Sequence, residues 1–562
     1  MNGAQLLIAC LENEGVKQIW GYPGGAIMPV YDALLDSSIE HYLTRHEQGA
    51  GFAAQGAARS TNRTAVCMAT SGPGATNLIT AIGDAYMDSI PLVVITGQVP
   101  TNLMGTDAFQ ELDVFGISLP ITKHSYIVEN ADEIPRIVRE AFELAHSGKS
   151  GPVLIDFPKD IANQPTAERP LERPHAEFKL SVKVPDADSE AMRIAKTLIG
   201  QAQSPLIYAG GGVEKADAVE DFREFVRVTG IPVVHTLHGL GGLPGGDPQF
   251  LGMLGMHGSQ AANLAVQNCD LLIAIGARFD DRATGKLAEF APKAKAIHIN
   301  LDPSEFGKLR VVQSALSGDV GANLKALSTP LNIQAWIEQT QAWKREHQFQ
   351  YGCPFDSIFA PRLLYDLSQS LNDRETFICC DVGQHQMWVA QHYQFSHPRF
   401  HLTSGGAGTM GFGLPAAIGV QQSNPASRSV VVSGDGSIMM NIQELATIKR
   451  YQLPVKILLF DNQALGMVRQ WQQLFFNNRE SEIDLSDNPD FCQVARAFGI
   501  PAMRAVHRDQ ESEVISAIKN TEGPLFVHAL IDRTANVWPL VPPGANNAQM
   551  ITTDIDTGIA AP

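Results

Sequence analysis

The chain has 562 residues, of which 44% are hydrophobic and 18% charged, as is typical of a folded globular protein with several domains. Its 42 basic and 59 acidic side chains give a net charge of −17, which argues against nucleic acid or an anionic membrane as a partner. No apolar run is long enough to span a bilayer.

The seven cysteines show neither CxxC nor metal-ligand spacing, so we expect reduced thiols in a cytoplasmic protein. Cys379 and Cys380 are adjacent in a strand-like run, where burial is expected rather than a strained bridge. The first helical pattern starts almost at Met1 with no signal or transit segment before it, which favours a bacterial cytoplasm.

The first region, residues 1–165, is predicted to be an α/β domain. Its candidate strands, each followed by a glycine-rich or polar loop, are residues 64–69, 91–96 and 153–157. Residues 166–186 are rich in proline, glutamate and arginine and lack apolar periodicity, so they are predicted to be a linker.

The middle region, residues 187–330, is predicted to be a second α/β domain. Its short apolar runs are typical of a parallel sheet, and they cover residues 206–209, 232–235, 271–275 and 296–300. Gly210-Gly211-Gly212 follows the first run, GARFDDR follows the third, and Asp302 and Asp319 end later strands. By itself this pattern fits either a nucleotide-binding domain or a structural spacer. Residues 331–352 are predicted to be a charged, helix-like bridge of low order.

The last region, residues 353–562, contains a predicted strand at 377–381 and one clear βαβ unit. In that unit Val430–Val432 and Val455–Phe460 are strand-like and Asn441–Arg450 is helical. A right-handed crossover makes the two strands parallel, so their carboxyl ends share one edge of the sheet. The tail from Val541 is rich in proline, glycine and asparagine, and either covers the site or is loose.

That edge carries Gly434-Asp435-Gly436 and Asp461-Asn462. A carboxylate, an amide oxygen and a carbonyl of the following loop are the hard oxygen ligands that Mg²⁺ prefers. The helix that follows Gly436 points its amino end at the same place, which favours a diphosphate. GDG alone would more often be an ordinary turn, but a second polar strand end beside it predicts a metal site.

The first and last regions look like two copies of one domain. Matching features occur in the same order at a nearly constant separation: SGPG from Ser71 and SGDG from Ser433, Pro91 and Pro454, Gln98 and Gln463, and the strands that start at Gly151 and Gly523. Where the last copy has Asp435, the first has Pro73, so only one copy is expected to hold the metal.

Several motifs occur together in a recognisable order: RHEQGA, TSGPGATN, GTDAFQE, GARFDDR, GQHQMW, GTMGFGLPAAIG, and GDG followed by an Asn-ending strand. With these motifs the chain resembles the thiamine diphosphate enzymes, and in particular the catalytic subunits of acetohydroxyacid (acetolactate) synthases. The family pattern usually ends in two asparagines, whereas this chain has Asp461-Asn462; only the second position is a metal ligand in the family.

The resemblance implies three doubly wound parallel-sheet α/β domains, which bind the cofactor pyrimidine, FAD and the cofactor diphosphate in that order. It implies decarboxylation of pyruvate on thiamine diphosphate and transfer of the two-carbon unit to pyruvate or 2-ketobutyrate. The products are 2-acetolactate and 2-aceto-2-hydroxybutyrate, which begin isoleucine, leucine and valine biosynthesis. Thiamine diphosphate, Mg²⁺ and a non-redox FAD are the implied cofactors.

The resemblance also implies roles for individual residues. Glu47 would hydrogen-bond a pyrimidine nitrogen and set up the proton transfer, with Tyr22, Gly25, Pro73 and Asn77 around the pyrimidine and substrate, and with Phe109, Gln110 and Lys159 facing the substrate. The implied diphosphate and thiazolium group comprises Gln384, His385, Gly408, Met410, Gly434, Gly436, Ser437, Gly466 and Met467, with Asp435, Asn462 and Ala464 as metal ligands. Val468 and Trp471 would line the substrate channel, and Trp471 would favour 2-ketobutyrate by shape. Each of these residues could instead be an ordinary core or surface position.

The implied FAD group comprises Gly210, Gly211, Gly212, Thr236, Leu237, Met256, His257, Gly258, Gly276, Ala277, Arg278, Asp280, Arg282, Asp302 and Asp319. The family commonly has Arg where Lys149 stands, which is expected to weaken one FAD contact. Gly406, Gly408 and Gly411 also satisfy GxGxxG, but the acidic residue at Rossmann distance is Asp435 inside GDG, so we assign this loop to thiamine diphosphate.

The family precedent implies a homodimer or a dimer of dimers with shared sites, and a small regulatory subunit. Two alternatives remain open. One is another 2-keto-acid enzyme of the same cofactor class, a pyruvate oxidase or a glyoxylate carboligase; GARFDDR and Trp471 argue against the first, and Glu47 argues against the second. The other is a non-catalytic regulatory homologue, which the intact cofactor, metal and acid positions disfavour.

Overall fold

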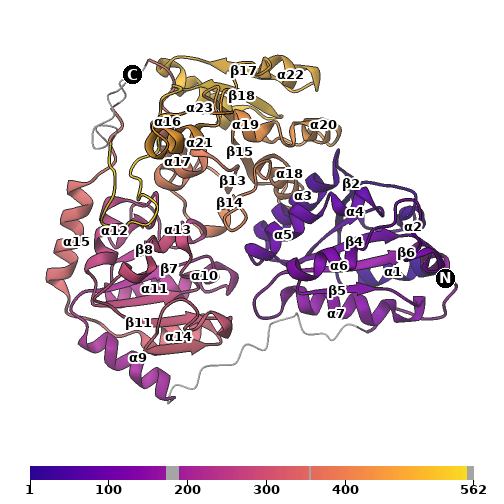
Figure 1. Ribbon diagram of the computed structural model, residues 1–562, viewed down its shortest axis with the longest axis horizontal. Helices are drawn as coiled ribbons and strands as arrows, with labels where there is room; N and C mark the ends of the chain where they lie inside the picture. The colour runs from indigo at the N-terminus through magenta and orange to yellow at the C-terminus, as the bar shows by residue number, and fades with distance from the viewer. Residues whose placement is uncertain (173–188, 353–355, 554–562) are drawn as a thin grey trace.

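The computed structural model describes residues 1–172, 189–352 and 356–553, which form three α/β domains, each built on one six-stranded sheet (Figure 1). All neighbouring strands in the three sheets are parallel. The predicted fold class is therefore confirmed. Most of the predicted linker 166–186, the start of the middle region and the final residues 554–562 of the tail lie outside the described residues.

The first domain has the strand order β2-β1-β3-β4-β6-β5. Its strands are β1 (Gln18–Gly21), β2 (Glu40–Leu43), β3 (Ala65–Ala69), β4 (Leu92–Gln98), β5 (His124–Ile127) and β6 (Pro152–Pro158). Its helices are α1 (Gly3–Asn13), α2 (Met28–Leu34), α3 (Glu47–Thr61), α4 (Pro73–Thr76), α5 (Ile79–Met87), α6 (Val114–Ser118), α7 (Ile134–His146) and α8 (Lys159–Asn163).

The middle domain has the strand order β12-β11-β10-β7-β8-β9. Its strands are β7 (Pro205–Ala209), β8 (Val233–His235), β9 (Phe250–Met253), β10 (Leu271–Ile275), β11 (Lys295–Asn300) and β12 (Ser314–Ser317). Its helices are α9 (Glu190–Gln201), α10 (Gly212–Lys215), α11 (Val219–Thr229), α12 (Gln260–Asn268), α13 (Asp281–Thr284), α14 (Val320–Leu327) and α15 (Gln334–Glu346). Helix α15 is not a low-order bridge: it packs on this domain, where the buried Trp336 Nε1 donates to Pro205 O at 2.9 Å.

The last domain has the strand order β14-β13-β15-β16-β18-β17. Its strands are β13 (Thr376–Cys380), β14 (His401–Thr403), β15 (Arg428–Gly434), β16 (Lys456–Asp461), β17 (Ala502–Ala505) and β18 (Leu525–Leu530). Its helices are α16 (Ala360–Ser370), α17 (Gln384–His392), α18 (Gly413–Ser423), α19 (Asp435–Ile438), α20 (Leu445–Arg450), α21 (Gly466–Phe475), α22 (Phe491–Ala497) and α23 (Glu511–Asn520).

In the first and last domains, alternating side chains place a separate apolar core on each face of the sheet. Val430 and Val432 on β15 point into one core, while Val431 points into the other. Strand β3 behaves the same way, with Val66 and Met68 on one side and Cys67 on the other. Strands buried on both faces read as continuous apolar runs, which is why these were predictable from sequence.

The first and last domains have the same topology, since each strand of one sheet takes the place of its counterpart in the other. The correspondence extends to the loops. Helix α4 starts at Pro73, the third residue of SGPG, and α19 starts at Asp435, the third residue of SGDG after β15. The two domains are thus two copies of one fold, as the repeated sequence features predict.

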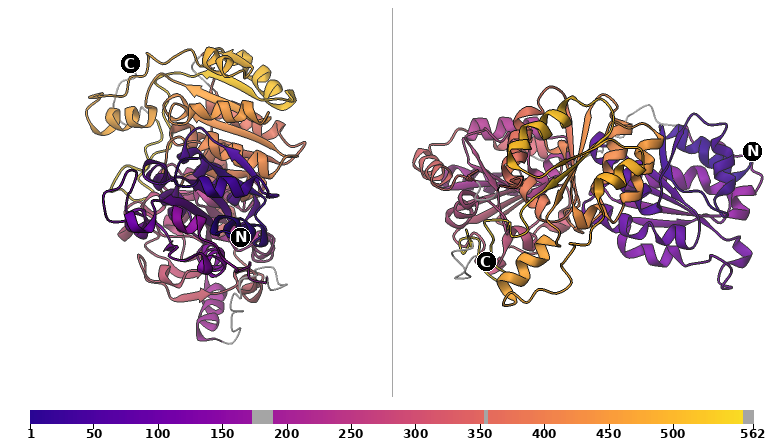
Figure 2. Two further views of the ribbon diagram at one scale, coloured as in Figure 1. Left: turned by 90° about the vertical axis from the view of Figure 1, so that its right-hand side faces the viewer. Right: turned by 90° about the horizontal axis from the view of Figure 1, so that it is seen from above.

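Helices α3 and α18 join these two copies, and they are themselves counterparts, each lying between the second and third strands of its domain (Figure 1). A Cβ on Gly56 would lie 2.1 Å from Ala416 O, and a Cβ on Gly419 would lie 1.8 Å from Ala53 O. The contact is therefore reciprocal, glycine against alanine in both directions. Seen from above in Figure 2, the last domain lies between the other two.

Two further predictions concern the chain as a whole. The six cysteines within the described residues, Cys10, Cys67, Cys269, Cys379, Cys380 and Cys492, are all free and buried. Among the helices of the described residues, none is long and apolar enough to cross a membrane.

Candidate functional site

The edge predicted to hold a metal is formed by the carboxyl ends of β15 and β16, which pair in parallel along Val430–Gly434 and Lys456–Phe460. Asp435 is buried there, and its Oδ2 accepts a hydrogen bond from Asn488 Nδ2 at 3.0 Å. Burial and the adjacent Asp461 carboxylate raise the pKa of Asp435, so an unneutralised carboxylate is unfavourable at this place. Asp461 keeps its charge more easily because His528 Nε2 lies 2.7 Å from its Oδ2.

The two other predicted metal ligands lie on the loop after β16. The Asn462 side chain is buried; its Nδ2 donates to Gln384 Oε1 at 3.2 Å, and its Oδ1 accepts from Ala464 N at 3.2 Å. A Cβ on Gly466 would lie 2.1 Å from Gln384 Oε1, so any larger residue would displace the Gln384 amide. The oxygen-rich, cation-poor donor set fits Mg²⁺. In the described parts of the chain no cluster of three or more His, Cys, Asp or Glu side chains offers an alternative metal site.

Next to this edge, His385 offers an unused polar atom. Its Nε2 is buried without a hydrogen-bond partner among the described residues, and burial lowers the pKa of the imidazole to about 3. Gly383, with φ +153°, and Gly434 pack against the ring; a Cβ on either would lie within 2.8 Å of it. Ser437 Oγ donates to Val382 O at 2.7 Å and ties α19 to the same loop. A buried orphan donor or acceptor beside a helix amino end fits a polar ligand such as a diphosphate.

The glycine loop between β14 and α18 carries Gly408 and Met410. Gly408 has φ +66° and Gly411 φ +87°, conformations that favour glycine. The loop is held at its end by the buried Asp381, whose Oδ1 accepts from Gly411 N at 2.7 Å. Met410 is half-buried and faces the cavity described next.

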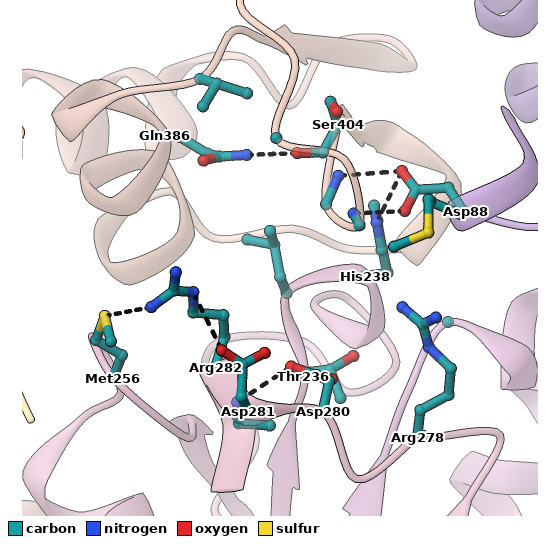
Figure 3. A pocket seen from close by; sticks show the side chains of 18 of the residues that line it. Asp88, Thr236, His238, Met256, Arg278, Asp280, Asp281, Arg282, Gln386 and Ser404 are labelled. Atoms are coloured by element: carbon teal, nitrogen blue, oxygen red, sulfur yellow. Dashed lines mark hydrogen bonds and ion pairs between the residues drawn. The ribbon is translucent and has the colours of Figure 1, made fainter. Parts of the chain in front are cut away.

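A cavity of about 1490 Å³ lies where the three domains meet, and Figure 3 shows part of its wall. Most predicted FAD residues line it: Gly210, Gly211, Gly212, Thr236, Leu237, Met256, His257, Gly276, Ala277, Arg278, Asp280, Arg282 and Asp302. From the last domain it is lined by Gly408, Met410, Met467, Val468 and Trp471. The structure therefore brings the middle-domain group, the glycine loop and the channel residues around one space.

Two predicted FAD residues do not line this cavity. Asp319 caps α14, accepting from Ala322 N at 2.8 Å, and Gly258 closes a turn in which its N donates to Gly255 O at 2.9 Å. Lys149 does line the cavity, and its Nζ lies 3.7 Å from Asp302 Oδ2.

The middle-domain wall suits an anionic, planar ligand. Gly276, at φ +55°, touches Gly212 so closely that a Cβ would lie 2.6 Å from the Gly212 carbonyl carbon, which keeps the ends of β7 and β10 open. Arg278 and Arg282 extend from the loop after β10, and Arg282 Nη1 lies 3.7 Å from Met256 Sδ. Guanidinium groups beside closely packed glycines can bind phosphates or ring carbonyls.

The first-domain residues form a second group. Glu47 is the first residue of α3, where the helix dipole favours its charge, and its Oε2 accepts from Asn77 Nδ2 at 3.0 Å. A Cβ on Gly74 would lie 3.3 Å from Glu47 Oε1, which places α4 beside the carboxylate, and Gln110 packs on Gly72.

This group does not line the cavity, and much of it faces outwards. The side chain of Phe109 is 88% exposed, and Tyr22 is also exposed. Gly25 has no heavy atom near its open side, and Lys159 starts α8 at the end of β6. Within one chain, the structure does not unite Glu47 with Asp435 in one cavity.

Several cavity residues were missed by sequence reasoning. Asp88, Lys215, His238 and Ser404 line the space, and Asp88, His238 and Ser404 appear in Figure 3. A local signal was the spacing of Asp84, in α5, and Asp88, directly after it: like charges four residues apart repel each other, which favours a cation between them.

Three family models match the chain: the N-terminal TPP binding domain of thiamine pyrophosphate enzymes at residues 1–117, their central domain at 192–327 and their C-terminal TPP binding domain at 381–529. Acetolactate synthase isozyme 2 large subunit of Escherichia coli is 54% identical over 98% of this chain and 99% of its own length. A probable acetolactate synthase large subunit of Methanocaldococcus jannaschii is 44% identical over 98% of this chain and 95% of its own length. Acetolactate synthase 1 of Nicotiana tabacum, a chloroplastic protein, is 44% identical over 98% and 85%.

Proposed function

Because the chain belongs to the thiamine pyrophosphate enzymes and, within them, to the acetolactate synthase large subunits, we propose that it condenses pyruvate with a second 2-keto acid in branched-chain amino-acid biosynthesis. The acceptor would be pyruvate or 2-ketobutyrate. The observation that carries this proposal is the near-complete match to acetolactate synthase large subunits, together with one cavity shared by Met410, Trp471 and the middle-domain glycines.

Bound thiamine diphosphate would supply the carbanion-stabilising chemistry of the reaction. Asp435, Asn462 and the Ala464 carbonyl would hold Mg²⁺, and Gln384 and His385 would orient the diphosphate. Met410 would support the ring system from the glycine loop. The middle-domain glycines and arginines, which line that wall, would hold FAD without redox chemistry.

Glu47 would hold and pass the proton that the reaction needs. Within the described residues, Asn77 donates to Oε2, while Oε1 accepts no hydrogen bond and is the oxygen open to a ligand nitrogen. Gln110, Phe109 and Lys159 would bind and orient the substrate: Gln110 packs on Gly72 beside the SGPG turn, Phe109 is exposed, and Lys159 starts α8 at the end of β6.

Product analysis with an equimolar mixture of pyruvate and 2-ketobutyrate, with and without FAD, tests this function. We expect 2-acetolactate and 2-aceto-2-hydroxybutyrate with release of CO₂. Acetate with rapid bleaching of the flavin would instead indicate a pyruvate oxidase. Binding of thiamine diphosphate and Mg²⁺ without CO₂ release would indicate a non-catalytic homologue.

We propose a homodimer in which the first domain of one chain faces the last domain of the other. Tyr22 and Phe109 of the Glu47 group are exposed. The exposed large apolar side chains of the two domains include Leu103, Leu112, Ile117 and Leu119 in the first domain and Met439 and Met440 in the last. Apolar surface of this kind is typical of an interface with another chain.

Mixing two inactive variants tests the shared site. Glu47→Gln and Asp435→Ala chains, each expected to be inactive alone, should regain activity when refolded or co-expressed together, because one site of the mixed dimer then contains neither substitution. Turnover per mixed dimer, separated by two different affinity tags, is the measurement. If each site lay within one chain, mixing would restore nothing.

Trp471 is proposed to select the acceptor. It projects from α21 into the cavity and contacts Phe475 edge to face, with ring centroids 5.4 Å apart. Trp471→Leu is expected to reduce the ratio of 2-aceto-2-hydroxybutyrate to 2-acetolactate by about tenfold, the usual range for one methylene in an apolar pocket. Trp343→Leu, on α15 away from the cavity, is the control and should leave the ratio unchanged; an unchanged ratio in Trp471→Leu would contradict the role.

The matched relatives from Escherichia coli are named large subunits, and we propose that this chain also pairs with a small regulatory subunit. We also propose a cytoplasmic location, which fits the free, buried thiols of the described residues.

A further inference from the structure

A buried charged cluster lies where the three domains meet. Arg59 of α3 bonds two carboxylates of α5: its Nη2 lies 3.3 Å from Asp84 Oδ2 and 2.9 Å from Asp88 Oδ2. All three side chains are almost completely buried. Buried charges of this kind are stable only when they are paired, so the cluster fixes the end of α5 as a rigid anchor.

The anchor holds the glycine loop of the last domain. Asp88 Oδ2 accepts from Gly405 N at 3.0 Å and Oδ1 from Gly406 N at 2.8 Å, as Figure 3 shows. Asp84 Oδ1 accepts from Ser404 Oγ and, at 3.2 Å, from Thr409 Oγ1. Charged hydrogen bonds to backbone N–H groups are stronger than neutral ones, so the first domain imposes the conformation of this loop.

The loop leaves no room for adjustment at these contacts. A Cβ on Gly405 would lie 2.1 Å from His238 Nε2, and a Cβ on Gly406 would lie 2.8 Å from Met87 Cβ. At its other end the loop is fixed by Asp381, which accepts from Gly411 N and Phe412 N. Met410 therefore lies between two carboxylate anchors, Asp88 of the first domain and Asp381 of the last.

The middle domain reaches the same carboxylate. His238 Nε2 lies 3.3 Å from Asp88 Oδ2, and Lys215 Nζ donates to the backbone oxygen of Asp88. Although burial opposes its charge, Asp88 faces His238, Arg59 and two N–H groups, which hold the pKa of its carboxyl well below the usual range. Asp88, Lys215 and His238 all line the large cavity beside the middle-domain glycines.

The opposite half of the duplicated fold has a matching contact. Glu444 of the last domain is buried, and its Oε1 accepts from Arg45 N at 2.9 Å, just before Glu47 starts α3. A Cβ on Gly49 would lie 2.4 Å from this oxygen. Asp88 of the first copy thus holds the loop that precedes α18 in the last copy, and Glu444 of the last copy holds the segment that precedes α3 in the first. The first of these segments leads to Met410 and the second to Glu47, both proposed to act on the cofactor.

We propose that Asp88 is a positioning residue for thiamine diphosphate and that, through His238, it couples cofactor binding to occupation of the middle-domain part of the cavity by a flavin. The inference rests on the proposed function. It assigns to Asp88 no contact with the reacting atoms: Asp88 acts through the backbone of residues 405–406 and so through the position of Met410.

The coupling has a defined physical basis. A ligand against the middle-domain wall restricts His238 and Lys215, which in turn favours the arrangement in which Asp88 holds the glycine loop. By linkage, FAD then tightens thiamine diphosphate binding by the same factor as thiamine diphosphate tightens FAD binding. The wild-type factor is expected to be about fivefold or more.

Binding titrations of the full chain test this inference without a measurement of turnover. Affinity for thiamine diphosphate with Mg²⁺ is measured by calorimetry with and without FAD, and affinity for FAD by the change in flavin fluorescence. Asp88→Asn is expected to weaken thiamine diphosphate binding by about 10–100-fold, as expected for loss of charged hydrogen bonds. His238→Ala is expected to weaken thiamine diphosphate binding without FAD by less than Asp88→Asn does, because Asp88 keeps its hydrogen bonds to Gly405 N and Gly406 N, while abolishing the tightening by FAD.

Glu14→Gln is the matched control, since Glu14 is a buried carboxylate of the same domain that pairs with Arg139 at 2.6 Å, away from the cavity. It should lower the melting temperature as Asp88→Asn does but leave both affinities unchanged. Equal affinities of wild type and Asp88→Asn for thiamine diphosphate, or an unaltered FAD effect in His238→Ala, would overturn the inference. Pyruvate turnover by the wild type would still uphold the proposed function. A wild-type chain that bound no thiamine diphosphate would overturn both.

Discussion

Replacing Glu47 with glutamine is expected to reduce pyruvate turnover by about 10²–10⁴-fold, the usual contribution of a positioned acid or base. Glutamine keeps the shape of the side chain and can still accept from Asn77, but it cannot hold a proton at the position of Oε1. The start of α3 should therefore stay intact, with the Glu444 contact to Arg45 preserved.

Steady-state CO₂ release gives the rate, and calorimetry shows whether thiamine diphosphate still binds. We expect a loss that falls mainly on kcat. Glu40→Gln, on an exposed strand of the same domain, is the control and should behave as wild type. Turnover of Glu47→Gln within about tenfold of wild type would remove Glu47 from the proton-transfer role.

Asp435→Ala is expected to abolish metal-dependent binding of thiamine diphosphate and, with it, activity. Asp435 is the proposed charged ligand at the edge of the sheet, and loss even of groups that only support metal ligands costs about 10–100-fold in affinity. We therefore expect the affinity for Mg²⁺ with thiamine diphosphate to fall by roughly 100-fold or more. Calorimetric titration with Mg²⁺ at a fixed thiamine diphosphate concentration is the measurement.

Asp461→Asn is the control that distinguishes the loss of a proposed metal ligand from the loss of a carboxylate that only lies beside it. Asparagine at 461 can still accept from His528, and it produces the Asn-Asn pair that is usual in the resembled family. This variant should retain Mg²⁺ binding and turnover. Full activity of Asp435→Ala would end the assignment of the metal site, whatever Asp461→Asn did.

The strands that sequence reasoning predicted are those buried on both faces. Strands β3, β4, β6, β7, β8, β10, β11, β13, β15, β16 and β18 were found because they read as apolar runs. The edge strands β2, β5, β9, β12 and β17 were missed, and each has exposed or half-buried positions that interrupt the apolar pattern. The interior strand β1 was missed as well, because only four residues form it. An edge strand pairs on one side only, so its composition resembles that of a loop.

The site divides in the same way. Asp435 and Asn462 lie at strand ends within short motifs, so their proximity followed from parallel topology, whereas His385 was assigned by the resemblance. The contact of Asp88 with Gly405 and His238 joins three domains and has no local pattern. Its prediction would have required the relative placement of the domains, which depends on glycine–alanine contacts such as Gly56 with Ala416.

The reciprocal contact of α3 with α18 means that the chain is, in effect, a dimer of itself fused into one polypeptide. Glu47 precedes Ala53 by the same number of residues as Met410 precedes Ala416, so the two residues hold equivalent positions in the two copies of the fold. At this position the first copy has a carboxylic acid and the last copy a thioether. At the position of Pro73 and Asp435 the acid is instead in the last copy. Under the proposed function, neither copy therefore carries a complete centre, because Glu47 occurs in the first copy only and Asp435 in the last copy only.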